Sequence, residues 1–371
     1  MPTPCYNNLR IGACGELPPR KHGASWLTRR LARQITVTQM AVKENPAAPE
    51  AATDTQTRPW SKSYPAGLSW TARFEPGLVH SLLDQAVQRH GARVCTHFEG
   101  QRLTYAEIGA LSDRAAKGLT ALGVREGVRV GLLLPNSPTY LIYYFAILKA
   151  GGTVVNFNPL YSIEEIAFQI TDSQTAIMVT LDLELLFKKI EPLLADGTLE
   201  RAVVGDFASL LPKLKQIGIK LTRRVRRAKL GRSHQRRRIV REHDLLANDG
   251  LFTRPVVKPE TVAVLQYTGG TTGTPKGAML SHPNIFINTS QVRMWGQRPP
   301  EATDRVLGVL PLFHVFAMTT VMTFGIASGM ELILMPKFEM GQTLNLIGTL
   351  RPTVMPGVPT LFQALLHHRN I

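Results

Sequence analysis

The chain has 371 residues, of which 44% are hydrophobic, and a formal net charge of +16 at pH 7. This length is too great for one small core and predicts two domains or subdomains. The excess of Lys and Arg lies in residues 1–39 and 213–241, so the rest of the chain is nearly neutral. Cys5, Cys14 and Cys95 show no metal-ligand spacing, and their odd number, with two of them in the N-terminal tail, argues against a disulfide framework and for a reducing compartment.

The first 57 residues are predicted to be a disordered extension and linker. Residues 1–39 are rich in Arg and poor in acids, and they lack the apolar core of a secretory signal. They faintly resemble a mitochondrial presequence, but we favour an upstream extension of a protein that starts at Met40. Residues 45–57, "NPAAPEAATDTQT", have the composition of a flexible linker, so we expect structure to begin near Trp60.

The first folded elements are a predicted hairpin and helix in "VCTHFEGQRLTYAEI" (94–108). Glu99-Gly100 marks the turn, and Thr104 with Glu107 forms a capping box at the start of the helix. A buried strand follows in 128–137, and then a helix that begins at Pro138 and stops at Gly151.

Strands and helices then alternate along the chain, which predicts an α/β fold with mostly parallel sheets. Ser162 and Glu165 cap one of these helices, and Ser281 and Pro283 mark the entrance of another. The remaining strands are predicted in 153–161, 175–180, 201–206, 261–268 and 331–338. The chain ends within a predicted helix in 351–371.

The apolar run 312–330, "LFHVFAMTTVMTFGIASGM", comes closest in length to a membrane span. Because it contains His314, several threonines and interior glycines, a buried helix or the wall of a cavity is the better interpretation.

The segment "YTGGTTGTPKG" (267–277) predicts a phosphate-binding loop directly after a strand. Glycines expose backbone N–H groups, threonines add hydroxyl donors, and Lys276 adds a cation. Gly277 follows the lysine, which excludes a Walker A loop, and the dinucleotide-binding pattern of glycines is also missing. The predicted ATP- and phosphate-binding residues are Tyr267, Thr268, Gly269, Gly270, Thr271, Thr272, Gly273, Thr274, Lys276 and Gly277.

These eleven residues resemble the signature loop of the AMP-forming adenylating enzymes, which include acyl-CoA synthetases, peptide-synthetase adenylation domains and luciferases. The form "LQYTGGTTG" followed by "KGAMLSH" is most similar to bacterial long-chain fatty acid–CoA ligases. Four further family-like segments appear in the expected order: 58–70, "LTYAEI" (103–108), "LKAGGTVVNFNP" (148–159) and "PLFHVFA" (311–317). The resemblance therefore covers residues 58–371, as a partial AMP-binding domain with a basic insertion at 208–242.

The resemblance implies a two-step reaction with ATP, Mg²⁺ and coenzyme A. A fatty-acid carboxylate attacks the α-phosphorus of ATP, pyrophosphate leaves, and the CoA thiol then attacks the acyl adenylate. Residues 268–276 would hold the β and γ phosphates, and Thr268 would help to bind Mg²⁺. His314 matches the family position that lines the acyl and adenylate pocket, and Phe313, Phe316 and Met318 beside it would suit an acyl tunnel or a hydrophobic core.

The basic run fits an amphipathic helix in which Leu210, Leu214, Ile217, Leu221, Val225 and Ala228 form one face. Such a helix favours the surface of an anionic membrane, although a disordered insertion is an equal alternative. Nucleic acid is not expected as a partner, because the run lacks interleaved aromatic residues. The resulting prediction is a cytoplasmic enzyme that binds the inner face of the membrane peripherally; a homodimer is left open.

Several family segments have no counterpart in the 371 residues. Neither Tyr-Gly-x-Thr-Glu nor Tyr-x-Thr-Gly-Asp is present, nor is the small C-terminal domain with its catalytic Lys. The fold expected from the resemblance is thus the N-terminal large domain, cut before its third subdomain is complete, with no catalytic residue assigned. We expect the chain alone to bind ATP weakly and to form little acyl adenylate. The alternatives are another adenylate-forming enzyme or a non-catalytic membrane- or partner-binding protein.

Overall fold

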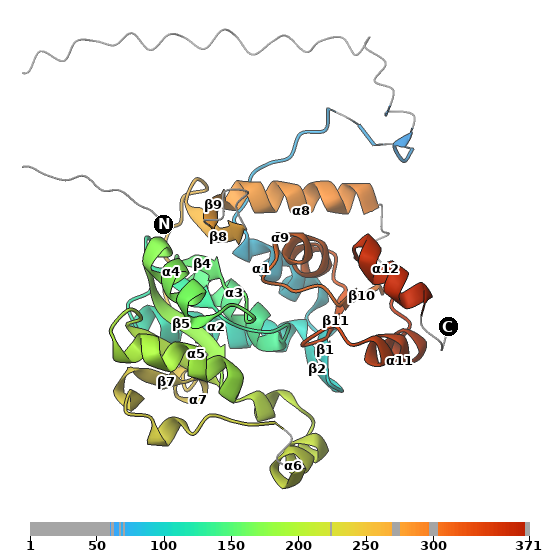
Figure 1. The fold of residues 1–371 in the computed structure, drawn as a ribbon. Helices are drawn as coiled ribbons and strands as arrows, with labels where there is room; N and C mark the ends of the chain where they lie inside the picture. Colours follow the sequence, from blue (N-terminus) through green and yellow to red (C-terminus); the bar gives the residue numbers. More distant parts are fainter. Residues whose placement is uncertain are drawn as a thin grey trace, which may run out of the picture. The chain divides into compact units, whose positions relative to one another are not determined.

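The computed structural model divides the chain into two units, Met1–Lys62 and Ser63–Ile371. It describes residues 60, 63–66, 68–69, 71–222, 225–268, 275–296 and 303–367. The predicted disorder of 1–57 lies outside the described residues. The second unit contains two β-sheets and the helices that cover them (Figure 1).

The larger sheet has seven described strands in the order β7-β6-β5-β3-β4-β8-β9. All neighbouring strands are parallel except β8 and β9, which form an antiparallel hairpin at one edge. The predicted parallel βαβ units are therefore confirmed. The strands are β3 (Arg129–Leu132), β4 (Thr153–Asn156), β5 (Thr175–Leu181), β6 (Arg201–Gly205), β7 (Ile239–Arg241), β8 (Val262–Thr268) and β9 (Lys276–Ser281).

The smaller sheet has the order β10-β11-β1-β2 and contains the predicted hairpin. Its strands are β1 (Val94–Phe98), β2 (Gln101–Thr104), β10 (Arg305–Gly308) and β11 (Glu331–Leu334). Glu99 and Gly100 connect β1 to β2 with φ angles of 54° and 95°. Two consecutive positive φ angles suit the tight turns of β-hairpins, and glycine adopts them without a steric penalty.

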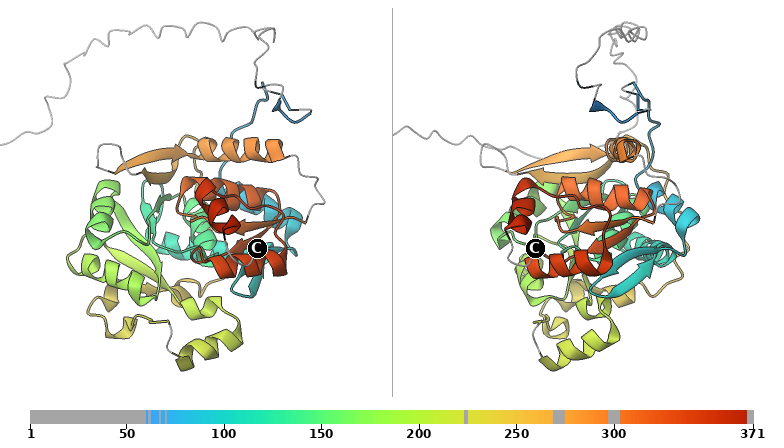
Figure 2. Two further views of the ribbon diagram at one scale, coloured as in Figure 1. Left: turned by 45° about the vertical axis from the view of Figure 1, so that its right-hand side comes forward. Right: turned by 90° about the vertical axis from the view of Figure 1, so that its right-hand side faces the viewer.

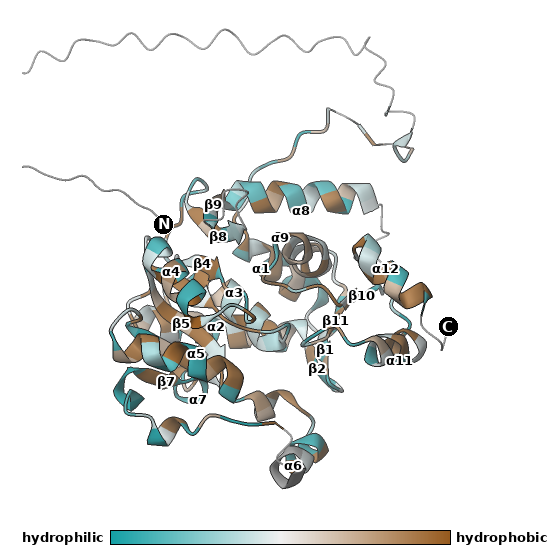
Figure 3. Cartoon of the chain, viewed as in Figure 1, coloured by the Kyte–Doolittle hydropathy of each residue, from teal (hydrophilic) through white to brown (hydrophobic). Residues whose placement is uncertain are grey.

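Helices and sheets alternate in five layers. Between the sheets lie α1 (His80–His90), α2 (Tyr105–Ala121) and α3 (Pro138–Lys149), which share one core with the inner faces of both sheets. The other face of the larger sheet packs on α4 (Ile163–Ser173) and α5 (Glu184–Ala195). The other face of the smaller sheet packs on α11 (Met340–Leu350) and α12 (Pro359–Leu366). In Figure 3 the hydrophobic colour is concentrated on these packed strands and helix faces.

Helix α3 is buried along its whole length, because both sheets and their helices surround it. Its sequence, "PTYLIYYFAILK", is apolar on every side, which is typical of a helix with no solvent-facing surface. The predicted stop is confirmed, since Gly151 has a φ of 78° and could not carry a side chain there without strain.

Local start signals work as predicted at two helices. Thr104 and Glu107 form a reciprocal capping box at α2, and Ser162 and Glu165 form another at α4. Each box satisfies backbone N–H groups that the first helical turn leaves without a partner.

The apolar run 312–330 is helical and mostly buried, as the sequence predicts. It forms α9 (Val315–Ala317), a π-helix (Met318–Thr323) and α10 (Phe324–Ala327). The long helix α8 (His282–Gly296) follows the β8–β9 hairpin, and the left view of Figure 2 shows hairpin and helix end to end along the top. None of the described helices combines the length and the hydropathy that crossing a membrane would require.

The basic run does not form the single amphipathic helix expected from Leu210 to Ala228. Helix α6 (Lys213–Thr222) ends earlier, and Ala228 lies in a non-helical stretch that packs on the core beneath α5. Residues 226–228 instead pair with the chain that follows β5. Arg227 forms ion pairs with Asp182 and Asp206, and main-chain hydrogen bonds join Arg226 to Glu184 and Ala228 to Asp182. The run then ends as strand β7, followed by α7 (Glu242–Leu245).

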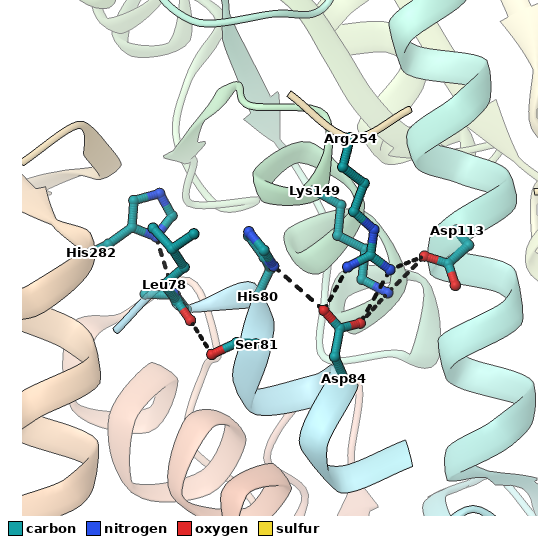
Figure 4. Close-up of polar contacts among 9 residues, drawn as sticks. Leu78, His80, Ser81, Asp84, Asp113, Lys149, Arg254 and His282 are labelled. Carbon is teal, nitrogen blue, oxygen red and sulfur yellow. Dashed lines mark hydrogen bonds and ion pairs between the residues drawn. The ribbon is translucent and has the colours of Figure 1, made fainter. Parts of the chain in front are cut away.

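A cluster of charged side chains around the buried Lys149 joins α1, α2, α3 and the segment before β8 (Figure 4). Lys149 Nζ, 1% exposed, lies 3.0 Å from Asp84 Oδ1 and 2.8 Å from Asp113 Oδ1. Arg254 contacts the same two carboxylates, at 2.6 Å and 2.9 Å. Burial alone would raise the pKa of Asp84, but hydrogen bonds from His80 and Arg254 hold that pKa well below its usual value.

Candidate functional site

The predicted phosphate-binding segment lies at the carboxyl edge of the larger sheet. Strand β8 ends at Thr268 and β9 begins at Lys276, and these two residues pair across the hairpin. The predicted residues Gly269, Gly270, Thr271, Thr272, Gly273 and Thr274 lie outside the described residues. The carboxyl edge of a parallel sheet is where α/β proteins bind their ligands.

Tyr267 and Gly277 fix the base of this hairpin. The ring of Tyr267 lies so close to Gly277 that a Cβ at position 277 would be 3.0 Å from it. The Tyr267 hydroxyl contacts the carboxylate of Asp172 on α4. Burial and this carboxylate raise the pKa of Tyr267, so the phenol stays protonated and donates to Asp172. Tyr267 therefore acts here as a support of the hairpin.

Thr268 and Lys276 are exposed and face each other across the strand pair. Within the described part of the chain, Lys276 forms no ion pair, so its ammonium group is free to meet an anion. The described residues also contain no cluster of three or more His, Cys, Asp or Glu that could hold a metal ion. Mg²⁺ usually binds through one or two carboxylates together with substrate phosphates, so a metal here would rely on ATP for ligands.

The second predicted region, 311–317, follows strand β10 of the smaller sheet. His314 is exposed and caps α9, because its Nδ1 accepts a hydrogen bond from the Phe316 N–H at 3.4 Å. Phe316 is 41% exposed. The predicted roles of His314 and Phe316 as substrate-lining residues stay predictions.

Two cavities flank this region. The α8 cavity, of about 420 Å³, lies between the hairpin, α8 and the start of the π-helix, and is lined by Leu280, Ile285, Asn288, Val315, Met318 and Thr319, among others. The proline-lined groove, also of about 420 Å³, contains Phe313 together with Pro135, Pro159, Pro311 and Phe338. The structure thus places Phe313 in a different cavity from Met318. Since π-helical turns often occur at functional sites, the α8 cavity is the better candidate for a substrate.

Polar side chains that were not predicted from the sequence join the two regions. Gln266, two residues before Thr268, donates to the carbonyl of Phe313 at 3.0 Å. Asn156, at the end of β4, donates to Gln266 Oε1 at 2.9 Å. The signal in the sequence was an amide residue within each of two mostly apolar strands, "TVVN" and "VAVLQYT".

The model of the AMP-binding enzyme family matches residues 83–371 of this chain. A long-chain-fatty-acid–CoA ligase of Bacillus subtilis (strain 168) is 35% identical over 327 residues, covering 85% of this chain and 56% of the relative. A 4-coumarate–CoA ligase of Arabidopsis thaliana is 30% identical over 270 residues, covering 72% of this chain and 44% of the relative. The chain thus spans about half the length of the curated relatives it matches.

Solved structures show the same fold. A long-chain-fatty-acid–CoA ligase from Archaeoglobus fulgidus superposes with a TM-score of 0.66 at 24% identity, covering 82% of this chain and 56% of that one. The anthranilate–CoA ligase AuaEII, in complex with anthranoyl-AMP, gives a TM-score of 0.65 at 20% identity, covering 80% of this chain and 51% of that one. These matches confirm the predicted α/β layers of an adenylate-forming N-terminal domain.

Proposed function

Because the chain belongs to the AMP-binding enzyme family, we propose that it supplies the phosphate and acyl ends of the active site of an AMP-forming acid–CoA ligase. The substrate class that its relatives favour is a long-chain fatty acid. The observation that carries the proposal is the exposed pair of Thr268 and Lys276 at one end of the β8–β9 hairpin, whose other end contributes Leu280 to a cavity that Val315 of the second predicted region also lines.

In the proposed reaction, a carboxylate oxygen of the fatty acid attacks the α-phosphorus of ATP. The bond from the α-phosphorus to the bridging oxygen breaks, pyrophosphate leaves with the electron pair, and the products are acyl-AMP and pyrophosphate. The CoA thiol then displaces AMP, giving the thioester. Negative charge grows on the departing pyrophosphate, so a positioned ammonium group lowers the barrier. Lys276 is the candidate for that role, and Thr268 adds a hydroxyl donor.

The acyl group is proposed to enter the α8 cavity. Leu280, near the end of β9 away from Lys276, lines it together with Val315 of the second region and Met318, so an apolar chain there would lie against the hairpin. Mg²⁺ bound to ATP would neutralise the phosphate charge, and Thr268 is the residue proposed to approach the metal.

Replacing Lys276 by methionine is expected to weaken binding of Mg-ATP to the 371-residue chain by about 10- to 100-fold, the value of one charge-assisted hydrogen bond. Isothermal titration measures this change. Lys258→Met is the matched control, because Lys258 is exposed and lies just before the opposite end of β8. Equal losses in both variants would argue against a specific phosphate contact.

Palmitate-dependent ATP–pyrophosphate exchange is expected to be small for this chain, and robust exchange would overturn that expectation.

We also propose that the basic run binds an anionic membrane surface. Helix α6 exposes Leu214 (84%) and Ile217 (56%), and seven cations of the stretch that follows are exposed: Arg226, Lys229, Arg232, Arg236, Arg237, Arg238 and Arg241. Apolar side chains next to cations fit a lipid interface, where each cation adds about 1 kcal/mol.

Replacing Leu214 and Ile217 together by serine is expected to lower binding to vesicles containing phosphatidylglycerol by about tenfold or more, because two interfacial apolar side chains are lost. Co-sedimentation with phosphatidylcholine vesicles, with and without phosphatidylglycerol, measures this. Leu251→Ser is the control, since Leu251 is 77% exposed but lies outside the basic run. Unchanged binding of the double variant would exclude α6 as the contact.

A further inference from the structure

Buried polar side chains hold the loop after β10 against the larger sheet. We define the Asn156–Gln266 bridge as Tyr140, Asn156 and Gln266, which are 0%, 3% and 6% exposed. They come from α3, β4 and β8. Tyr140 contacts the carbonyl of Leu312 and Gln266 contacts that of Phe313, whereas Asn156 contacts the side chains of Tyr140 and Gln266.

The bridge satisfies its polar atoms internally. The Tyr140 hydroxyl lies 2.6 Å from Asn156 Oδ1 and 3.0 Å from the carbonyl of Leu312, and donates to one of the two. Asn156 Nδ2 donates to Gln266 Oε1 at 2.9 Å and reaches Met318 Sδ at 3.7 Å. Gln266 Nε2 completes the line by donating to the Phe313 carbonyl at 3.0 Å.

A second contact fixes the same loop from the neighbouring strand. Asn136, which follows β3, accepts a hydrogen bond from the Leu312 N–H at 2.7 Å and donates to the carbonyls of Gly308 and Leu310. The main chain of the loop is thus held by the bridge at Leu312 and Phe313 and by Asn136 at Gly308, Leu310 and Leu312. In a buried site, a hydrogen-bonded network of this kind favours one arrangement, because alternatives leave further buried polar groups unpaired.

The bridge ends next to both predicted regions. Gln266 precedes Thr268 by two residues of the same strand, a distance of about 7 Å. Phe313 precedes His314 directly, and Met318 lines the α8 cavity. A ligand that immobilises the residues at one end of the bridge also restricts the residues at the other end, because the connection is stiff. A second ligand that binds at that other end then loses less conformational entropy.

We propose that Asn156 and Gln266 are positioning residues that couple the two ends of the site. They hold the main chain at Leu312 and Phe313 at a fixed place relative to Thr268 and Lys276. As a result, a fatty acid bound in the α8 cavity strengthens the binding of ATP at the hairpin, and bound ATP strengthens the binding of the fatty acid. The coupling rests on the proposed function, whereas the holding of the loop does not.

The first experiment tests the holding of the loop, by hydrogen–deuterium exchange of the 371-residue chain. Gln266→Met keeps the side chain's length but removes both of its hydrogen bonds. Amide exchange in 311–318 is expected to accelerate by about tenfold or more, because buried partners are left unpaired. Thr180→Val is the control, since it removes a buried hydrogen bond from β5 to the Leu133 carbonyl without touching the loop. Equal exchange in 311–318 for the two variants would overturn the proposal.

The second experiment tests the coupling, which a purely structural role would leave unchanged. The chain is titrated with Mg²⁺ and α,β-methylene ATP, whose α,β linkage cannot be cleaved, in the presence and absence of laurate. We expect laurate to tighten nucleotide binding about fivefold or more in the unmodified chain and in Thr180→Val, and not in Gln266→Met. Coupling that persists in Gln266→Met would overturn the proposal. If the unmodified chain binds neither ligand, the proposed function fails, and the exchange experiment alone decides whether the bridge holds the loop.

Discussion

Replacing Lys149 by methionine is expected to destabilise the chain by about 3–5 kcal/mol, the usual cost of removing one partner from a buried ion pair. Lys149 is 1% exposed and contacts both Asp84 and Asp113. Without it, two carboxylates share the single charge of Arg254 (Figure 4). Because the carboxylates are 32% exposed, water will offset part of the loss, which favours the lower end of this range.

Denaturant unfolding of matched variants measures this effect. Lys117→Met is the control, because Lys117 pairs with Asp249 at 2.6 Å on the surface, where the side chains are 35% and 60% exposed. That pair should contribute about 0–1 kcal/mol. Adding Asp113→Asn to Lys149→Met should restore part of the stability, since it removes the surplus carboxylate. A loss below about 1 kcal/mol in Lys149→Met would show that the cluster does not hold the helices together.

Elements with strong local signals could be predicted from the sequence. The turn at Glu99-Gly100 and the capping boxes at Thr104 and Ser162 are as expected, because neighbouring residues alone determine these structures. Strands β7 and β9 were not predicted. Strand β9 pairs with its chain neighbour β8 across a hairpin, whereas the three residues of β7 owe their conformation to β6, which ends far earlier in the chain at Gly205. Nonlocal pairing of this kind leaves no periodic trace in a short segment.

The amphipathic helix expected from Leu210 to Ala228 also shows how tertiary contacts limit prediction from local sequence. Here the sequence pattern predicted more regular structure than the chain forms. Its spacing was helical, but Arg227 gains two ion pairs at the sheet edge by leaving the helix. Tertiary contacts outweigh intrinsic helix propensity, which amounts to a few tenths of a kcal/mol per residue. A segment with helical periodicity can therefore form either a helix or an irregular stretch at a sheet edge, when one of its cations can pair with carboxylates at the ends of two strands.

For the candidate site, residue chemistry identified the regions but not how they are joined. The glycines, threonines and Lys276 point to phosphate through their donors alone. By contrast, the partnership of Asn156 and Gln266 requires two parallel strands to be neighbours, β4 and β8, which are more than a hundred residues apart in the chain. The two side chains meet only because β4 and β8 are adjacent in the sheet, so their hydrogen bond could be recognised only once the strand order was known.

The chain is expected to lose stability as the pH falls from about 6.5 to about 4, because His282 must stay neutral in the fold. His282 is 1% exposed, and its Nδ1 accepts a hydrogen bond from the Val79 N–H at 3.0 Å, at the start of α1. Burial, with a smaller contribution from His80, lowers the pKa of His282 to about 4. A protonated ring could no longer accept this bond, and its charge would face the positive end of the helix dipole.

The direction of the effect follows from proton binding. Between these two pH values the unfolded chain binds a proton at His282 that the folded chain does not, so acidification favours unfolding, by up to about 3 kcal/mol. Glu242 opposes this trend in the same window. Burial raises its pKa to about 7, so the folded chain binds the extra proton there. Only the difference between variants therefore isolates the histidine.

His282→Asn is the informative variant, because the asparagine Oδ1 can accept from Val79 N–H without titrating. Its free energy of unfolding should match that of the unmodified chain near pH 7 to within about 1 kcal/mol and exceed it increasingly toward pH 4. His243→Asn should change nothing, since His243 is 93% exposed. Urea unfolding at several pH values measures the three curves. Parallel curves for His282→Asn and the unmodified chain would mean that another group causes the acid sensitivity.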